Sequence, residues 1–330
     1  MYQLISELVS ERKTEVVRHV NQTLVQLYFE VGRIIVEHLQ DGAERAGYGK
    51  DVLKRLAKRL SENLGSGFSV ANLTNMRLFY LVYSKSETLS PISQLPDFQL
   101  SWSHYLKLSR VDDPQERRFY EIEATQNNWS LRELRRQMDS ALYQRLALSR
   151  DKEGVRQLAE QGQVVQKPTD ALKDPYILEF LDLPEQTRYS EADLEAELID
   201  KLEHFLLELG KGFTFVARQK RITFDEKHFH IDLVFYNRLL RCFVLIDLKI
   251  GEIQHQDIGQ NQMYVNYYDR FMKLDEENKT IGILLCQDKS DTLVEITLPE
   301  DNTQIFASKY ATVLPDKEAL RRLVAESLRD

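Results

Sequence analysis

The chain contains 330 residues, of which 42% are hydrophobic and 29% are charged, a composition typical of a globular protein with about two domains. No segment approaches the roughly 20 uninterrupted apolar residues that a membrane-spanning helix needs, because the best candidate, residues 24–36, contains Glu30 and Arg33. Acidic residues come early, and no cleavage site follows an apolar run, so we expect no signal peptide.

The net charge of −8 is divided unevenly along the chain. Residues 1–150 carry 21 Lys and Arg against 18 Asp and Glu, whereas residues 151–330 carry 23 against 34. The slightly basic first half is compatible with phosphate contacts, and the acidic second half with a metal-dependent active site. The charge therefore permits nucleic-acid binding but does not by itself predict it.

The two cysteines, Cys242 and Cys286, fall in predicted buried strands and lack CxxC spacing. Cysteines of this kind are expected as small core residues in a reducing compartment. The sequence therefore predicts a cytoplasmic protein.

The first half is predicted to be all-helical, because apolar residues recur there at spacings of three and four. Ser69 and Ser130 stand at expected N-cap positions, and Gly65 closes the helix that precedes Ser69. The predicted helices cover residues 2–39, 51–63, 71–82, 102–108, 114–126 and 131–148. We therefore expect a helical domain over residues 1–150.

Residues 151–174 are predicted to be a linker. The apolar periodicity is lost there, and Gly154, Gly162 and Pro168 interrupt the chain. A second domain is expected over residues 175–330.

The second half is predicted to combine helices with strands. Helices are expected over residues 191–209, 256–275 and 317–328, and strands over residues 213–224, 229–236, 240–249, 280–286 and 303–309. The order of one helix, three consecutive strands, a helix and a strand indicates a mixed α/β layout with antiparallel hairpins and one crossover.

The segment IDLVFYNRLLRCFVLIDLK reads as a β-hairpin with Asp232 near its start and Asp247 near its end. Alternate side chains of a strand share a face, so Asp247 and Lys249 point the same way. A turn centred between residues 239 and 240 would set Asp232 directly opposite Asp247. Two carboxylates about 4 Å apart repel by roughly 4 kcal/mol at an effective dielectric constant near 20. A positive group is therefore expected between them, either Mg²⁺ or the Lys249 ammonium.

The order of acidic residues in the second half resembles that of the PD-(D/E)xK nuclease superfamily. An Asp-x-Lys tripeptide is weak evidence alone, but here it ends an apolar strand, follows a strand with Asp232 and comes after a helix with Glu195. Four motifs of the second half resemble the YhcG-like family of nucleases: FLLELGKGF, IDLVFY, LRCFVLIDLKIGE and GQNQMY. Four motifs of the first half resemble the helical domain that precedes the nuclease domain in that family: LYFEVGRII, GYGKDVLKRLAKRL, FSVANLTNMRLFY and NNWSLRELRRQM. The resemblance covers nearly the whole chain. It implies a restriction-endonuclease-like α/β domain with a mixed central sheet, and metal-dependent endonuclease cleavage of DNA.

The resemblance also implies a set of metal ligands. Asp232, Asp247 and the carbonyl of Leu248 bind Mg²⁺ or Mn²⁺, and Glu195 completes the site from its helix. Glu191 and Glu197 are competitors for this role on the same helix, and the resemblance favours Glu195. The family more often has Glu at the position of Asp247, so the ligand has a shorter reach in this chain.

Two further residues take roles from the same resemblance. Lys249 orients and deprotonates the attacking water and offsets phosphate charge. Gln260, one turn into the following helix, matches the accessory glutamine of the superfamily.

Two other interpretations of Asp232, Asp247 and Lys249 stay open at this point. The three residues could form a structural salt-bridge cluster at a sheet edge. Alternatively, the nuclease fold could persist as a catalytically inactive module that binds nucleic acid or protein.

Basic residues near the hairpin are candidates for phosphate contacts. Arg218, Lys220 and Arg221 lie on the first of the three strands, although charged strand residues equally protect a sheet edge. His230 shares a face with Asp232 and is expected to line the site without binding metal.

The segment FSVANLTNMRLFY follows a short helix and a glycine turn, an order typical of a helix-turn-helix DNA reader, although generic helix packing gives the same pattern. It places Arg77 on the candidate reading helix, and the later helix adds Arg132, Arg135 and Arg136. We expect DNA as the partner, with RNA as an alternative, and no membrane partner. We also expect a homodimer, with the helical domain either reading DNA or mediating dimerisation.

Overall fold

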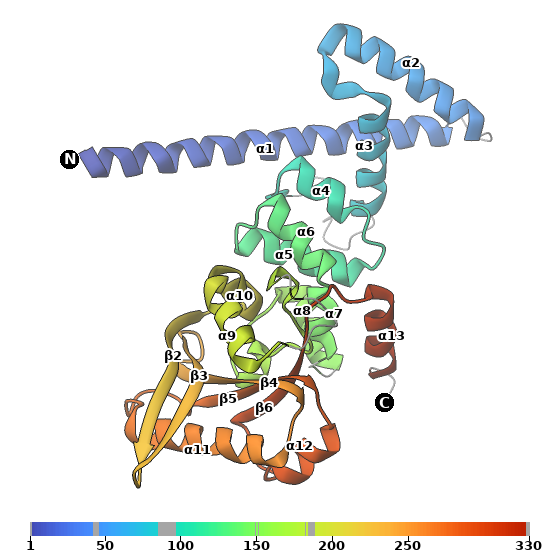
Figure 1. Ribbon diagram of the computed structural model, residues 1–330. Coiled ribbons are helices and arrows are strands. Elements are labelled where there is room, and N and C mark those ends of the chain that lie inside the picture. The colour runs from blue at the N-terminus through green and yellow to red at the C-terminus, as the bar shows by residue number, and fades with distance from the viewer. Residues whose placement is uncertain are drawn as a thin grey trace. The chain divides into compact units, whose positions relative to one another are not determined.

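The computed structural model describes residues 2–41, 46–84, 97–148, 150, 152–181, 183 and 189–327. The chain forms two compact units, which we call unit 1 (residues 1–135) and unit 2 (residues 136–330) and describe separately (Figure 1). Among the described residues, no helix has both the length and the apolar character needed to cross a membrane.

Unit 1 is helical, as the sequence predicts. Its helices are α1 (Tyr2–Asp41), α2 (Ala46–Leu64), η1 (Ser66–Phe68), α3 (Val70–Tyr83), α4 (Trp102–Leu108), α5 (Pro114–Gln126) and the start of α6 (Leu131–Asp139). The Ser69 hydroxyl accepts a hydrogen bond from the Asn72 backbone N–H at 3.2 Å, so the predicted N-cap of α3 is confirmed.

The core of unit 1 forms where α1 crosses α3. A Cβ added at Gly32 would overlap the backbone carbonyl of Met76, so only glycine permits this close approach. Phe79 is fully buried, and its ring centroid lies 5.7 Å from that of Phe29 and 4.9 Å from that of Phe98. Part of the apolar stripe of α1 is thus buried in the core of unit 1, whereas other apolar residues of this helix are exposed.

Two helices predicted as continuous are broken in the structure. Residues 131–148 form α6 and α7 (Leu142–Leu148), because Ala141 adopts a left-handed φ of 53° and the Ser140 carbonyl accepts a hydrogen bond from Arg145 Nε at 2.8 Å. Residues 191–209 form α9 (Glu191–Asp200) and α10 (Leu202–Leu209), with the break at Lys201. Apolar spacing continues across both breaks, so periodicity alone does not reveal them.

The segment predicted as a linker, residues 151–174, is structured instead. It contains α8 (Lys152–Gln161), whose Val155 and Leu158 are buried, and the short η2 (Pro168–Ala171). The division between the two units lies earlier, at Arg135 and Arg136. The sequence signal was missed because so short a helix offers only three buried apolar positions.

Unit 2 is built on a six-stranded mixed sheet with the order β1-β6-β5-β4-β3-β2. Its strands are β1 (Tyr176–Ile177), β2 (Phe213–Phe224), β3 (Lys227–Asn237), β4 (Cys242–Glu252), β5 (Ile281–Asp288) and β6 (Ile305–Ala311). Strands β2, β3 and β4 pair antiparallel, whereas β4, β5, β6 and β1 pair parallel. Two helices, α11 (His255–Phe271) and α12 (Asp291–Thr297), make two crossovers where the sequence predicted one. Helix α13 (Lys317–Ser327) ends the described chain.

Helices cover both faces of the sheet (Figure 1). On β3, Leu233 and Phe235 pack in one core with side chains of α9 and α10. The intervening Val234 packs in a second core with Tyr264 and Val265 of α11. This alternation explains why the hairpin strands are apolar on both sides.

The register of the β3–β4 hairpin is the one that sets Asp232 against Asp247. Cross-strand pairs run from Asn237↔Cys242 to Leu233↔Ile246, which centres the turn between residues 239 and 240. The buried Asn237 side chain shapes this turn by accepting hydrogen bonds from two backbone N–H groups of the turn at 3.0 and 3.1 Å.

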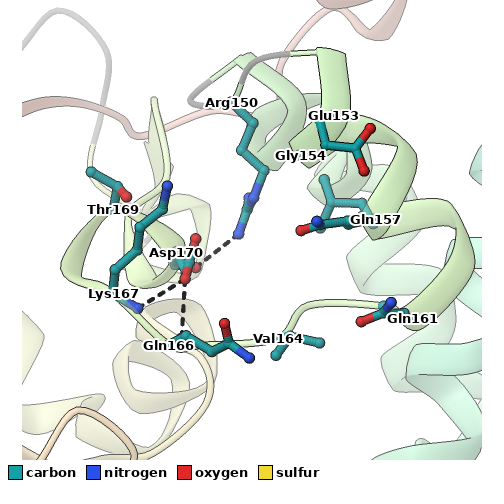
Figure 2. A pocket seen from close by; sticks show the side chains of 12 residues that line it. Arg150, Glu153, Gly154, Gln157, Gln161, Val164, Gln166, Lys167, Thr169 and Asp170 are labelled. Atoms are coloured by element: carbon teal, nitrogen blue, oxygen red, sulfur yellow. Dashed lines mark hydrogen bonds between the residues drawn. The ribbon is translucent and has the colours of Figure 1, made fainter.

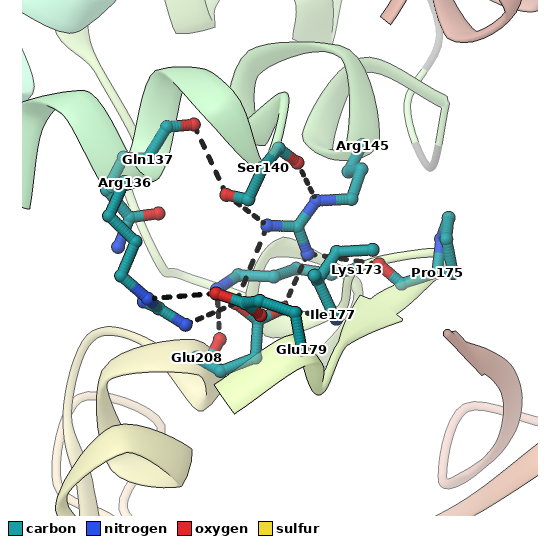
Figure 3. Close-up of polar contacts among 9 residues, drawn as sticks. All are labelled: Arg136, Gln137, Ser140, Arg145, Lys173, Pro175, Ile177, Glu179 and Glu208. Atoms are coloured by element: carbon teal, nitrogen blue, oxygen red, sulfur yellow. Dashed lines mark hydrogen bonds and ion pairs between the residues drawn. The ribbon is translucent and has the colours of Figure 1, made fainter. Parts of the chain in front are cut away.

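A buried charged network joins α7 to α10 and β1 within unit 2 (Figure 3). Arg145 and Glu208 are fully buried, and Arg145 Nη1 donates to Glu208 Oε1 at 2.5 Å. The same carboxylate oxygen accepts a hydrogen bond from the Ile177 backbone N–H at 2.9 Å, and Lys173 donates to the Glu208 backbone carbonyl. This network ties the segment that begins at Arg136 to the sheet domain.

Candidate active site

Asp232 lies one residue beyond the last cross-strand pair of β3 and β4. Its Oδ2 accepts a hydrogen bond from the Leu248 backbone N–H at 2.8 Å, and its Oδ1 accepts one from Gln219 Nε2 at 3.0 Å. The carboxylate therefore lies where β3 separates from β4, next to Leu248 of β4.

Asp247 is 4% exposed and is held by a buried amide of α11. Its Oδ2 accepts a hydrogen bond from Asn261 Nδ2 at 2.8 Å. Asn261 fits there because β5 has Gly282 beneath it, where any Cβ would overlap Asn261 Oδ1. A substitution at Gly282 would therefore displace the amide that orients Asp247.

Glu195 of α9 reaches the site through Gln219. The Gln219 amide nitrogen donates to Glu195 Oε2 at 2.6 Å and to Asp232 Oδ1 at 3.0 Å, which uses both of its hydrogens. Gln219 adopts a left-handed φ of 44°, a conformation that costs of order 1 kcal/mol for a non-glycine residue and that clusters at functional sites. The local backbone of β2 thus aims this side chain at two carboxylates.

Lys249 is placed between the N-terminal ends of α9 and α11. Its Nζ lies 3.7 Å from Glu191 Oε2 and 3.8 Å from Asp257 Oδ1. In the part of the chain that the structure describes, its ion pairs go to these residues and not to Asp232 or Asp247. The ammonium is near the aspartates without neutralising them through a direct ion pair.

Three carboxyl groups of the site have raised pKa values. Burial raises the pKa of Asp247 to about 7, and the neighbouring Asp232 adds to this while the Asn261 amide opposes it. Burial also raises the pKa of Asp232, against the Leu248 N–H and Lys249, and it raises the pKa of Glu195 against the Gln219 amide. The site therefore has a deficit of positive charge, which a cation would correct.

The donor set fits a hard divalent cation. Asp232, Asp247 and the Leu248 carbonyl offer oxygen ligands, and Mg²⁺ typically takes one or two carboxylates and keeps several waters. Among the described residues, no three His, Cys, Asp or Glu side chains converge closely enough to hold a metal by themselves. The two aspartates and the carbonyl thus match magnesium better than zinc, which prefers nitrogen and sulfur ligands.

The pKa of Asp247 predicts how stability depends on pH in the absence of metal. The folded state holds the Asp247 proton between about pH 4 and about pH 7, whereas the unfolded state releases it with a pKa near 3.9. The folded state binds more protons in this window, so the free energy of unfolding should fall as pH rises through it, by up to roughly 4 kcal/mol. Unfolding by urea in EDTA, measured at pH 5 and pH 8, tests this.

The Asp247→Asn variant supplies the control for that measurement. It should lose this part of the pH dependence and be more stable than the native chain at pH 8. Asp232→Asn, which removes the repulsion, should be neutral or stabilising in EDTA. A large loss of stability in Asp232→Asn would favour the structural salt-bridge interpretation.

The resemblance implies that Gln260 of α11 acts at the site as an accessory glutamine, but its neighbour Asn261 is the residue that contacts Asp247. Gln260 Nε2 donates to the Tyr264 hydroxyl, which donates to the His230 carbonyl at 2.9 Å, while Asn261 contacts Asp247. The buried face of α11 includes Ile258, Asn261, Val265 and Tyr268, a spacing of three and four that could have identified Asn261 from the sequence. Sequence reasoning also missed Gln219 and Asp257, and it weighed Glu191 only as an alternative to Glu195.

The arginines proposed for nucleic-acid contacts differ in accessibility. Arg77 on α3, Arg132 and Arg135 on α6, and Arg218 and Lys220 on β2 are exposed. Arg136 is half-buried, and its Nε lies 3.3 Å from Glu179 Oε1 (Figure 3). Its guanidinium also lies over the Phe180 ring. Arg136 is therefore engaged in unit 2, which speaks against its predicted role as a phosphate contact.

A polar pocket of about 650 Å³ lies between α8 and the loop that leads to η2 (Figure 2). Arg150 donates to the Asp170 backbone carbonyl at 3.0 Å, and the Lys167 backbone N–H donates to the Asp170 carboxylate at 2.9 Å. The carboxylates of the candidate site, Glu195, Asp232 and Asp247, do not line this pocket, so it has no part in that site.

Comparison with known proteins identifies the family. Residues 169–325 match the model of the YhcG PDDEXK nuclease domain, and residues 4–145 match the DUF1016 N-terminal domain. A protein of Escherichia coli (strain K12) named "Putative nuclease YhcG" is 38% identical over 341 residues, which cover 96% of this chain and 90% of that protein. The chain belongs to the YhcG family. The predicted resemblance and the restriction-endonuclease-like class of the second domain are thereby confirmed.

Two solved structures are distantly similar to this YhcG-family chain. A repair endonuclease from Pyrococcus abyssi is 17% identical with a TM-score of 0.27, over 38% of this chain and 49% of that one. A structure of EndoMS in complex with dsDNA is 15% identical with a TM-score of 0.26, over 41% and 50%. Similarity at this level carries no argument about substrate.

Proposed function

We propose that this YhcG-family chain is a Mg²⁺- or Mn²⁺-dependent endonuclease that hydrolyses phosphodiester bonds of DNA. The observation that carries the proposal is the buried Asp247, whose pKa is raised to about 7 beside Asp232 at the point where β3 and β4 separate. An uncompensated buried carboxylate next to a second one fits a cation site. DNA cleavage that requires Mg²⁺ and stops with EDTA tests the proposal.

The residues of the site have distinct parts in this proposal. Asp232, Asp247 and the Leu248 carbonyl hold the metal, which when bound supplies Lewis-acid stabilisation of the phosphate charge. Lys249, with its Nζ at the edge of the same site, orients the attacking water and offsets phosphate charge. Glu195 keeps Gln219 in place, and through Gln219 it fixes the orientation of the Asp232 carboxylate.

The geometry favours a metal site over a structural salt-bridge cluster. In such a cluster Lys249 would pair with the two aspartates, but among the described residues its partners are Glu191 and Asp257. A buried carboxylate pair without a side-chain cation between its members costs stability. A bound cation would offset this loss of stability, so a cation-binding role explains why the two carboxylates are kept together. An inactive module would not need the pair.

We propose that unit 1 serves assembly and DNA contact. Helix α1 has a second apolar stripe with spacings of seven and four, made of Val9, Val16, Val20, Leu27 and Ile34, each between 45% and 62% exposed. This heptad-like pattern is typical of a coiled-coil seam, and its occupant is a second copy of the chain. The exposed Arg77, Arg132 and Arg135 are the proposed phosphate contacts of this unit.

Light scattering of the full chain tests the dimer. We expect the mass of a dimer for the native chain and of a monomer for the double variant Val16→Glu with Val20→Glu, because like charges on a seam oppose pairing. The pair Glu7→Gln with Glu15→Gln, at exposed positions off the stripe, should leave the dimer intact. A native chain that is monomeric at micromolar concentration would contradict the proposed assembly.

The predicted cytoplasmic location remains a proposal. It is supported by Cys242 and Cys286, which are free and buried. Buried free thiols suit a reducing compartment.

A further inference from the structure

The β2–β3 hairpin continues past the candidate active site as a two-stranded arm. Strand β3 pairs with β4 only from Leu233 to Asn237, whereas it pairs with β2 as far as Phe224↔Lys227 (Figure 1). Residues 220–231 are therefore paired to each other where β3 no longer pairs with β4. This arm begins at Asp232 and leads away from it.

One face of the arm is apolar and packed. Ile222 and Ile231 are buried in the same core as Tyr264 of α11, and Phe224 and Phe229 pack against that core, their rings stacked at 5.0 Å. Because side chains alternate along a strand, the residues between these positions lie on the opposite face.

The opposite face carries an exposed polar set that we call the basic strip: Arg221, Thr223, His228 and His230. Arg221 is the cross-strand partner of His230, and Thr223 is the partner of His228. The next position toward the site is occupied by Gln219, which donates to Asp232. The basic strip is thus continuous with the residues that hold the candidate metal ligand.

Three side chains of the basic strip contact one another. Arg221 Nη2 lies 3.0 and 2.9 Å from the two ring nitrogens of His228, and the Thr223 hydroxyl lies 3.0 Å from His228 Nδ1. Among the described residues, Arg221 has no carboxylate partner within ion-pair distance, so its positive charge is not neutralised. Such a guanidinium in a strongly acidic half of the chain attracts an anion that the surrounding surface would repel.

We propose that the basic strip binds backbone phosphates of the nucleic-acid strand that enters the Asp232–Asp247 site. The inference rests on the proposed nuclease function and extends it to the path of the substrate. With about 3.4 Å per residue, His230 and His228 lie about 7 and 14 Å along the strand from Asp232. A guanidinium with neighbouring hydroxyl and imidazole groups matches phosphate oxygens, which accept several hydrogen bonds at once.

Binding of the full chain to nucleic acid in EDTA tests the strip without cleavage. The probes are a short fluorescent DNA duplex, its single strands, and RNA of the same sequence, each titrated over a range of salt concentrations. Arg221→Gln should weaken binding roughly tenfold for the preferred probe and lower the salt slope by about one unit. Arg221→Lys, which keeps the charge, should keep the salt slope.

Arg238→Gln is the matched control, because Arg238 is an exposed arginine in the turn at the other end of β3. It should leave affinity and salt slope unchanged, and both variants should melt like the native chain. The proposed strip would be overturned if Arg221→Gln and Arg238→Gln had equal effects on binding, or if neither had any effect. It would also be overturned if the native chain did not bind nucleic acid, or if polyglutamate competed for the chain as well as nucleic acid does.

The same variants separate the strip from the nuclease proposal when Mg²⁺ is added. If the native chain binds through Arg221 but cuts nothing, the strip stands and the activity fails. If the native chain cuts and Arg221→Gln binds and cuts equally well, the activity stands and the strip fails.

Discussion

Asp247→Asn and Lys249→Ala should each reduce Mg²⁺-dependent DNA cleavage by about 10³-fold or more. Stabilisation of phosphate charge by a bound metal is worth several kcal/mol, and each 1.36 kcal/mol is a factor of ten in rate. Asp247 is the buried member of the proposed ligand pair, and Lys249 is the nearby ammonium. The rate of cleavage of a fluorescent duplex at saturating enzyme gives the measurement.

Two surface variants serve as matched controls for these substitutions. Asp301→Asn and Lys279→Ala change exposed residues of loops and should cleave like the native chain. Asp247→Asn and Lys249→Ala should retain the fold and much of the DNA affinity in EDTA. If Asp247→Asn and Lys249→Ala both cleaved DNA at the native rate, the proposed active site would be wrong.

Glu208→Gln should destabilise unit 2 by about 3–5 kcal/mol. The change leaves the fully buried Arg145 without its counter-charge, and removing one partner of a buried ion pair carries a cost of this size. Burial by itself raises the pKa of Glu208, but Arg145 and Lys173 outweigh this and lower it. The ionised carboxylate thus stabilises the fold above the unfolded pKa near 4.3, and this contribution is lost as pH falls through the lower folded pKa.

The comparison with Glu203→Gln makes the measurement specific. Glu203 is an exposed residue of the same helix, α10, and its replacement should change the free energy of unfolding by less than about 0.5 kcal/mol. The double variant Arg145→Met with Glu208→Leu should recover much of the loss, because it removes both members of the ion pair. Equal stability of Glu208→Gln and Glu203→Gln in urea unfolding would show that the pair does not hold α7 to the sheet.

Local rules predicted the features of the site that depend on neighbouring residues in the sequence. Strand alternation and the length of the turn are local, so the opposition of Asp232 and Asp247 could be predicted before any tertiary contact was known. The Ser69 cap likewise depends on a hydrogen bond that spans three residues. These features match the structure because tertiary packing does not compete with them.

The missed features depend on contacts between distant segments. Asn261 reaches Asp247 only because α11 docks over Gly282, and Gln219 reaches Asp232 through an unusual backbone conformation. The ion pair of Arg136 was not foreseen for the same reason. A basic stripe on a helix suggests phosphate contacts, but its partner Glu179 lies 43 residues away in sequence and is brought close only by the fold.

The most direct test of the central claim is incubation of supercoiled plasmid with the purified full chain and Mg²⁺, with EDTA in a parallel reaction. We expect conversion to nicked and linear forms with Mg²⁺ or Mn²⁺, no conversion in EDTA, and none with Asp247→Asn. Plasmid that stays supercoiled in both metals, with a folded protein that still binds it, would contradict the claim that this site cleaves DNA.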